Sequence, residues 1–226
     1  MPASALIHSA TLVSAGIYAM LRFSALFGVS PHLTSLFAIV TSFTAFYGAV
    51  IAGFQTDVKK ILAYSTISHC GMLMFSVLMQ LPYVTMFYLF AHGFFKSLNF
   101  MCVGNFIQHS NNYQDVSRMG RLAASLSFER NVLSVTLFNL SSAPMFFCFF
   151  SKHWLLASTF VSSLLDPLIV AFIYGAAFSG FFYSAKLMFE SLMSSKRAHS
   201  SVYSVNALHA NSVLYRRSNS SSRWAI

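Results

Sequence analysis

The sequence predicts an all-α fold, a polytopic membrane helix bundle with about six transmembrane helices. Of its 226 residues, 56% are hydrophobic and only 8% are charged, and the mean hydropathy is +0.63. Soluble domains carry about 25% charged residues, and a globule of this size could not cover its surface with so few. Lipid needs no charged coat, so a bilayer suits this composition. The composition excludes a soluble enzyme.

Six stretches have the length of about 20 mostly apolar residues that a spanning helix needs. Helix-breaking residues separate them: Pro31 precedes the second stretch, Pro82 opens the fourth, and Asp166-Pro167 is typical of a helix start before the sixth. A polar connector over about 108–130 joins the fourth to the fifth. Together the stretches form one transmembrane domain. The expected spans are about 3–25, 33–54, 60–80, 83–107, 131–158 and 167–192, within a domain over 1–193.

The basic residues predict the orientation of the bundle. An even number of spans places both termini and the second and fourth loops on one side, where ten Lys and Arg residues gather, against Arg22 alone on the other. By the positive-inside rule, the basic side is the cytoplasm or the mitochondrial matrix. The ten are Lys59, Lys60, Arg118, Arg121, Arg130, Lys196, Arg197, Arg216, Arg217 and Arg223.

The last segment, 194–226, changes to Ser, Asn, Arg and His. We expect a basic, loosely structured tail on the same side, facing solvent or lipid headgroups rather than nucleic acid. The start of the chain has no pattern of a signal peptide or presequence, so we expect neither. The three cysteines show no CxxC or Cys/His cluster, and no haem, metal or nucleotide motif is present. We therefore expect no metal and no cofactor in this chain.

Two lysines fall inside the predicted spans. Lys96 lies in the middle of the fourth span, with His92 one turn before it on the same face. Lys152 lies in the fifth span and is followed by His153. A lysine at the bilayer centre costs about 2.5–3.5 kcal/mol on insertion scales, so function is the default interpretation. Burial disfavours the charged amine, which can then hold and release a proton.

Other polar residues are secondary candidates. Lys186 lies near the end of the sixth span, where it can reach the interface. His8 in the first span and His69 in the third are either relay groups or hydrogen-bonded packing residues. The alternative for Lys96 and Lys152 is a fixed pairing with a carboxylate. The chain's five carboxylates all fall at loops or helix ends, so such a partner would have to come from another chain.

The fifth span contains a proline. Pro144 precedes Lys152 by eight residues and removes a helix hydrogen bond, so we expect a discontinuous helix near it. Broken helices beside a buried charge recur at transport sites. The buried lysines and the break together point to the movement of ions or protons.

Four runs carry a resemblance to a known family: ALIHSATLVSAG (5–16), QTDVKKILAYSTISHCGML (55–73), HGFFKSLNFMCVG (92–104) and FFSK (149–152). They resemble the antiporter-like membrane subunits of respiratory complex I, and most closely subunit 5 (NADH dehydrogenase subunit 5). The resemblance covers about 1–190. It implies a five-helix antiporter-like repeat in which buried lysines and histidines relay protons.

The resemblance assigns the relay to Lys96, the central lysine of the second repeat, to Lys152 near the break, and to His92 and His8. Two departures stand out. Asp-Glu follows FFSK in the family, whereas His153-Trp154 follow here, and a family histidine one turn before His92 is Tyr88. The first repeat and the long lateral helix are missing. The chain resembles the later half of a subunit 5, so we expect a separate chain carrying the first half, or a truncated sequence.

The resemblance implies a proton-translocating membrane-arm subunit of NADH:ubiquinone oxidoreductase in the mitochondrial inner membrane, with both termini in the matrix. A bacterial plasma membrane is the alternative location. NADH, FMN, iron–sulfur clusters and ubiquinone would be bound by other subunits, and an adjacent subunit 4 and lipid are expected partners. The alternatives are a subunit of an Mrp-type cation/proton antiporter and a structural subunit with a decayed half-channel.

Overall fold

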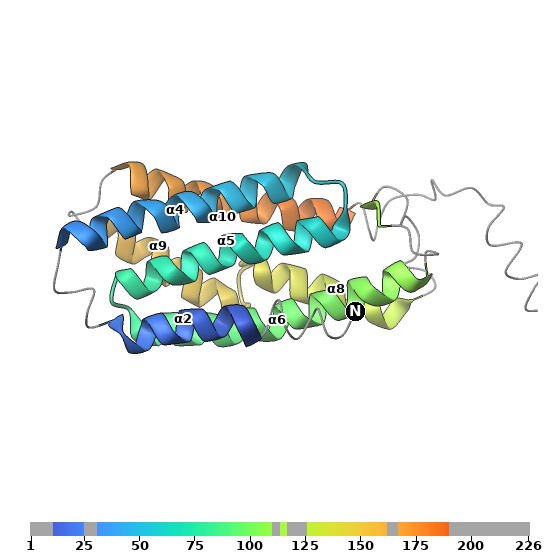
Figure 1. The fold of residues 1–226 in the computed structure, drawn as a ribbon. Coiled ribbons are helices and arrows are strands. Elements are labelled where there is room, and N and C mark those ends of the chain that lie inside the picture. Colours follow the sequence, from blue (N-terminus) through green and yellow to red (C-terminus); the bar gives the residue numbers. More distant parts are fainter. Residues whose placement is uncertain (1–10, 25–30, 110–113, 117–125, 162–166, 190–226) are drawn as a thin grey trace, which may run out of the picture.

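The computed structural model describes residues 11–24, 31–109, 114–116, 126–161 and 167–189. The described part is a bundle of helices that run along a common axis (Figure 1). The predicted all-α fold class is therefore confirmed. The helices are α2 (Leu12–Arg22), α4 (Pro31–Phe54), α5 (Val58–Leu78), α6 (Pro82–His109), α8 (Ser127–Leu140), α9 (Phe147–Val161) and α10 (Pro167–Met188).

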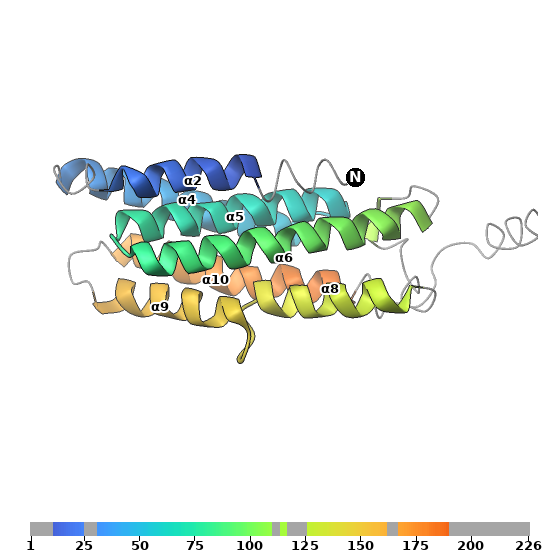
Figure 2. The same cartoon turned by 90° about the horizontal axis from the view of Figure 1, so that it is seen from below.

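Helix α5 lies at the centre of the bundle. It contacts α2, α4, α6 and α10. Seen from below in Figure 2, α8 and α9 lie end to end beside α6, and α10 lies behind them. Polar side chains that α5 presents to its neighbours are therefore shielded from lipid on several sides. This position makes α5 and the helices around it the place to look for a functional site.

The contact between α4 and α5 depends on small residues. A Cβ added at Gly71 would lie 2.7 Å from the Ala45 backbone nitrogen, so only glycine fits there without a shift of the helices. One turn away, the Ser68 hydroxyl donates to the Ala45 carbonyl at 2.8 Å. Small residues and hydroxyl groups of this kind allow close packing of helices within a membrane. The α4–α5 pair thus forms a tight frame for the site.

Two connections meet at one end of the bundle, on the right in Figure 1. The Val58 amide donates to the Gln114 carbonyl at 3.1 Å, and the Val116 amide donates to the Thr56 carbonyl at 3.0 Å. Asp57 beside them pairs with Lys60 at 2.9 Å. The hydrogen bond from Lys60 holds the pKa of Asp57 below its ordinary value. The second and fourth predicted loops therefore lie on the same side, as an alternating topology requires.

Three of the described helices are long and apolar enough to cross a membrane: His32–Phe54, Val58–Leu78 and Pro167–Met188. Helix α6 has 28 residues. The predicted span 131–158 is two shorter helices that lie end to end (Figure 2). Of the predicted span 3–25, α2 is described, and the boundary at 193 and the tail lie outside the described residues. The chain is a multi-pass membrane protein, and the count of six spans stays a prediction.

Candidate functional site

A buried polar stripe runs along one face of α6. Tyr88, His92, Lys96 and Asn99 are spaced by four, four and three residues, so they share a face of the helix. Each of them is at most 3% exposed. Burial of this many polar side chains in one membrane helix requires partners on the neighbouring helices. Those partners come from α5 and α8.

Lys96 binds a neutral partner. Its side chain is 1% exposed, and its ammonium donates a hydrogen bond to the hydroxyl of Ser65 on α5. The Ser65 hydroxyl itself lies 2.9 Å from the Leu62 carbonyl, to which it donates. A hydroxyl oxygen accepts from an ammonium but carries no charge to hold the proton in place. Among the described residues, the partner of Lys96 is therefore a neutral hydroxyl and not a carboxylate.

His69 on α5 lies between two tyrosine hydroxyl groups. Its Nδ1 is 2.6 Å from the Tyr88 hydroxyl oxygen, and its Nε2 is 3.0 Å from the Tyr183 hydroxyl oxygen on α10. The His92 ring lies next to it, with ring centroids 5.1 Å apart. His92 Nε2 is buried and has no hydrogen-bond partner among the described residues. The structure therefore joins His69 to the Lys96–His92 pair that the sequence singled out.

The predicted break near Pro144 is present. Helix α8 ends at Leu140 and α9 begins at Phe147, and Ser142 and Met145 between them adopt positive φ angles of 64° and 75°. In a continuous helix, the residue four positions after Leu140 would donate to its carbonyl group. That residue is Pro144, which has no N–H. The sequence therefore leaves the Leu140 carbonyl free of a helical partner.

Lys152 supplies the hydrogen-bond donor that the Leu140 carbonyl lacks. Its Nζ donates to the Leu140 carbonyl oxygen at 2.5 Å, and its side chain is 3% exposed. Lys152 thus connects α9 back to the end of α8 across the break. Like Lys96, it is held by a neutral acceptor. The side chains of Lys96 and Lys152 interact electrostatically with each other and with His92.

Asparagine and threonine side chains complete the site near the break. Asn139 on α8 accepts a hydrogen bond of 3.0 Å from the Cys148 amide and so satisfies one free N–H in the first turn of α9. Asn99 on α6 accepts one from the hydroxyl of Thr136 on α8. These interactions orient the two half-helices against α6. Sequence analysis did not single out Asn99, Thr136 or Asn139. The signal that could have found them is a polar side chain inside an otherwise apolar helical segment.

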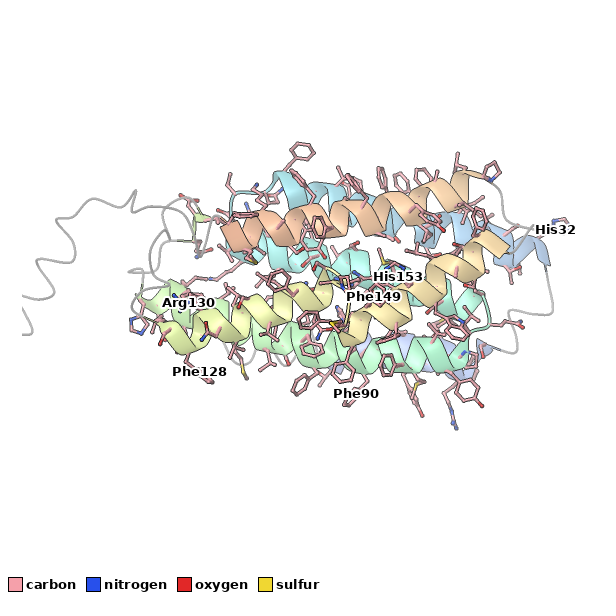
Figure 3. All side chains as sticks on the ribbon, turned by 180° about the vertical axis from the view of Figure 1, so that it is seen from behind. His32, Phe90, Phe128, Arg130, Phe149 and His153 are labelled. Atoms are coloured by element: carbon pink, nitrogen blue, oxygen red, sulfur yellow. The ribbon has the colours of Figure 1, made fainter. Side chains whose placement is uncertain are left out.

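Two predicted site residues, Lys186 and His153, lie elsewhere. Lys186 donates to the Gly53 and Gln55 carbonyl oxygens, both at 2.9 Å, and so caps the end of α4. His153 is exposed and lies against Phe149, with ring centroids 4.1 Å apart on α9 (Figure 3). His8 lies outside the described residues. Among the candidates, the structure brings together Lys96, His92 and His69 between α5 and α6, and it places Lys152 at the break between α8 and α9.

The arrangement can exchange protons. It combines two amines, two imidazoles, two phenols and a serine hydroxyl, all buried. Hydrogen bonds join Lys96 to Ser65, and Tyr88 and Tyr183 to His69. Among the described residues, no group of three His, Cys, Asp or Glu side chains could hold a metal ion. Cys70, Cys102 and Cys148 are free thiols. The functional chemistry that this set supports is proton binding and transfer.

Comparison with known proteins identifies the family of this chain. A family model described as NADH:quinone oxidoreductase/Mrp antiporter, TM, matches residues 1–216. NADH-ubiquinone oxidoreductase chain 5 of Paramecium tetraurelia is 43% identical over 227 residues, which cover 100% of this chain and 40% of that protein. Chain 5 of Chondrus crispus is 37% identical over 222 residues, which cover 94% of this chain and 33% of that protein.

A solved structure has the same fold. A chain of the Mrp complex from Dietzia sp. DQ12-45-1b matches with a TM-score of 0.74 and 31% identity, over 82% of this chain and 21% of that chain. This chain thus spans less than half the length of the curated relatives and of the solved structure that it matches.

Proposed function

We propose that this chain, which belongs to the NADH:quinone oxidoreductase/Mrp antiporter transmembrane family, translocates protons as a membrane-arm subunit of respiratory complex I. Lys96 is the central proton site, His92 and His69 are its neighbours, and Lys152 is the second lysine of the relay. The observation that carries this proposal is the hydrogen bond of a fully buried Lys96 to the neutral Ser65 hydroxyl.

The reason lies in what remains after the proton leaves. If a buried lysine is paired with a carboxylate, loss of its proton leaves an uncompensated buried charge, which is strongly unfavourable. Lys96 and Lys152 are bound instead by a hydroxyl and a carbonyl oxygen. Each can become a neutral amine without leaving a buried anion behind. Repulsion between the two cations gives a further reason for one of them to release its proton.

Complex I is favoured over other members of the family by the identity to the relatives called NADH-ubiquinone oxidoreductase chain 5. In this proposal the chain is part of an enzyme, the proton-translocating NADH:ubiquinone reductase, and other subunits bind NADH, FMN, iron–sulfur clusters and ubiquinone. Its partners are other membrane-arm subunits, with lipid around them. A separate chain with the first half of subunit 5 and an adjacent subunit 4 stay predictions. The proposed location is the mitochondrial inner membrane, with both termini in the matrix.

The second candidate function is that of a subunit in an Mrp-type cation/proton antiporter, which the structural match to the Dietzia Mrp complex favours. The two functions differ in their energy source. A complex I subunit moves protons when NADH is oxidised, whereas an Mrp-type subunit moves protons against another cation. Proton uptake by vesicles driven by a sodium gradient, without NADH, would support the antiporter.

The test is substitution of Lys96 in the intact complex, reconstituted in vesicles, with protons counted per NADH oxidised. Lys96→Met removes the proton site at similar length, and Lys96→Arg keeps a charge that does not dissociate near neutral pH. Both should assemble and both should lose most of the pumping. The control is Lys60→Met, because Lys60 is exposed at the end of the bundle. Normal pumping by Lys96→Met would indicate that this chain has only a structural role. Normal pumping by Lys96→Arg, with loss of pumping in Lys96→Met, would indicate that Lys96 acts as a fixed charge.

A further inference from the structure

Asn99 and Thr136 form a buried polar pair between α6 and α8. Asn99 is 0% exposed and Thr136 is 1% exposed. The Thr136 hydroxyl donates to Asn99 Oδ1, and it is also placed to donate to the Leu133 carbonyl of its own helix, at 2.9 Å. Asn99 Nδ2 is buried and has no hydrogen-bond partner among the described residues. The pair is therefore only partly satisfied.

Stability alone does not explain a pair of this kind. A buried donor without an acceptor costs free energy, whereas apolar groups of the same shape in place of both partners can be nearly neutral or even stabilising. Leucine at Asn99 and valine at Thr136 would have similar shapes and leave no polar atom unpaired. The best-attested role of a buried polar group is to fix the register of two helices. The pair is therefore a candidate for setting how α8 lies along α6.

This register determines which residues of the two helices are level with each other. Lys96 is three residues before Asn99, and Leu140 is four residues after Thr136, so each lies on the same helix face as its partner in the pair. The two helices run in opposite directions (Figure 2). Lys96 is therefore displaced from the pair by about 4.5 Å and Leu140 by about 6 Å in the same direction, toward the break. The Leu140 carbonyl lies at about the depth of Lys96.

Lys152 is bound to that carbonyl. Its Nζ donates to the Leu140 oxygen at 2.5 Å, so a shift of α8 along α6 would move the acceptor of Lys152. Lys96 is fixed differently, by its own helix and by the Ser65 hydroxyl on α5. The hydrogen bond between α6 and α8 consequently affects where one lysine lies relative to the other.

We propose that Asn99 and Thr136 are positioning residues that hold α8 in register with α6, so that Lys152 stays level with Lys96. This inference rests on the proposed function. The repulsion between two cations falls with their separation, so the separation sets how strongly a proton on one lysine favours release from the other. Asn99 and Thr136 neither gain nor lose a proton in this role.

The test is the double variant Asn99→Leu with Thr136→Val in the intact complex, reconstituted in vesicles. Assembled complex on native gels, the rate of NADH oxidation and the protons pumped per NADH are all measured. Both partners are removed together, so no new unpaired polar atom is buried, and we expect assembly and NADH oxidation to be retained. Pumping should fall by about half or more of the loss that Lys96→Met causes, because proton transfer depends closely on the placement of its groups.

The matched control is Ser76→Ala with Thr85→Val. These two residues form another buried polar pair, between α5 and α6, with their hydroxyl oxygens 2.8 Å apart. Thr85 is on the same helix as Asn99 but lies about 16 Å before Lys96 along its axis. This double variant should assemble and pump normally. A loss of pumping as large as that of Asn99→Leu with Thr136→Val would show that any buried polar pair matters, and would overturn the inference.

A conservative variant separates the hydrogen bond from the packing of the threonine. Thr136→Ser keeps the hydroxyl and should pump normally, whereas Thr136→Val keeps the shape, loses the hydroxyl and should pump less per assembled complex. If the double variant does not assemble, these two single variants decide. Equal pumping by Thr136→Ser and Thr136→Val would overturn the positioning role.

The outcomes also separate this inference from the proposed function. Normal pumping by Asn99→Leu with Thr136→Val, together with loss of pumping in Lys96→Met, would overturn this inference and leave the proposed function intact. Normal pumping by Lys96→Met as well would overturn both.

Discussion

Lys152 Nζ donates to the Leu140 carbonyl oxygen at 2.5 Å, across the gap between α8 and α9. This carbonyl is the one that Pro144 leaves without a helical donor, because Pro144 is four residues later and has no N–H. Pro144 thus leaves the Leu140 carbonyl oxygen without a helical donor, and the buried cation Lys152 donates to that same oxygen. The ammonium gains a strong acceptor in the membrane interior, and the end of α8 gains a donor.

Replacement of the proline tests this match. Pro144→Ala restores an N–H at the position that a continuous helix would use, and such a hydrogen bond contributes about 0.5–1.5 kcal/mol. The new amide competes with Lys152 for the Leu140 carbonyl, so we expect assembly to be retained and protons per NADH to fall. Pro82→Ala is the control, since Pro82 is the first residue of α6, where the N–H has no helical acceptor. Normal pumping by Pro144→Ala would show that the break does not matter for the relay.

Substitution of Lys152 separates its structural role from its proton. Lys152→Met leaves the buried Leu140 carbonyl without its donor, a loss of about 1–3 kcal/mol, so we expect less assembled complex on native gels as well as loss of pumping. Lys152→Arg supplies a donor that does not release its proton. We expect it to restore assembly but not pumping. Restored pumping in Lys152→Arg would mean that Lys152 only closes the break.

The sequence predicted those parts of the site that depend on a single helix. The separation of four residues places His92 and Lys96 on one face of α6, wherever that helix lies in the bundle. Pro144 breaks its helix regardless of the residues that pack against it. His153 shows that two residues adjacent in sequence need not belong to the same site. It follows Lys152 directly, but one residue along a helix is a rotation of about 100° around its axis. Lys152 is consequently buried while His153 is exposed.

The contacts between helices could not be read from the sequence. Tyr183 reaches His69 only because of how α10 is rotated and how far it lies along α5, and both depend on packing such as the close approach at Gly71. Ser65, Thr136 and Asn139 are ordinary residues in apolar runs, and only their partners distinguish them. Lys186 looked like an interfacial lysine, and its carbonyl partners on α4 appear only in three dimensions.

The approach of α4 to α5 provides a stability prediction. A Cβ at Gly71 would meet the Ala45 nitrogen at 2.7 Å, so Gly71→Ala should destabilise the bundle by about 1–3 kcal/mol, as overpacking does. Gly93→Ala is the matched control within α6, because a Cβ there meets nothing within 4 Å. We expect a lower midpoint of thermal unfolding in detergent for Gly71→Ala and an unchanged or higher one for Gly93→Ala. Equal midpoints would show that the helices shift apart without loss.

The Asp57–Lys60 pair predicts a small dependence of stability on pH. The hydrogen bond from Lys60 lowers the pKa of Asp57 in the folded chain, so its contribution is present above the unfolded-state pKa and is lost as the pH falls through the lower folded-state pKa. Asp57→Asn lacks this contribution at every pH. The unfolding midpoints of the native chain and Asp57→Asn should therefore differ slightly at neutral pH and converge in acid. A difference that grows in acid would contradict the assignment.

The orientation of the bundle can be tested at its two ends. The turn at Thr56 is joined by backbone hydrogen bonds to residues 114–116. This end carries Lys59 and Lys60, so the positive-inside rule predicts that it faces the matrix if the chain lies in the mitochondrial inner membrane as proposed. Tyr83 is 90% exposed and lies in the first turn of α6, at the end of the bundle opposite to Thr56. In vesicles with the matrix side outward, a membrane-impermeant maleimide should label Thr56→Cys but not Tyr83→Cys. Vesicles of the opposite orientation should give the reverse pattern, which makes each variant the control for the other. Labelling of Tyr83→Cys alone in matrix-side-out vesicles would invert the topology, and with it the side from which protons reach Lys96.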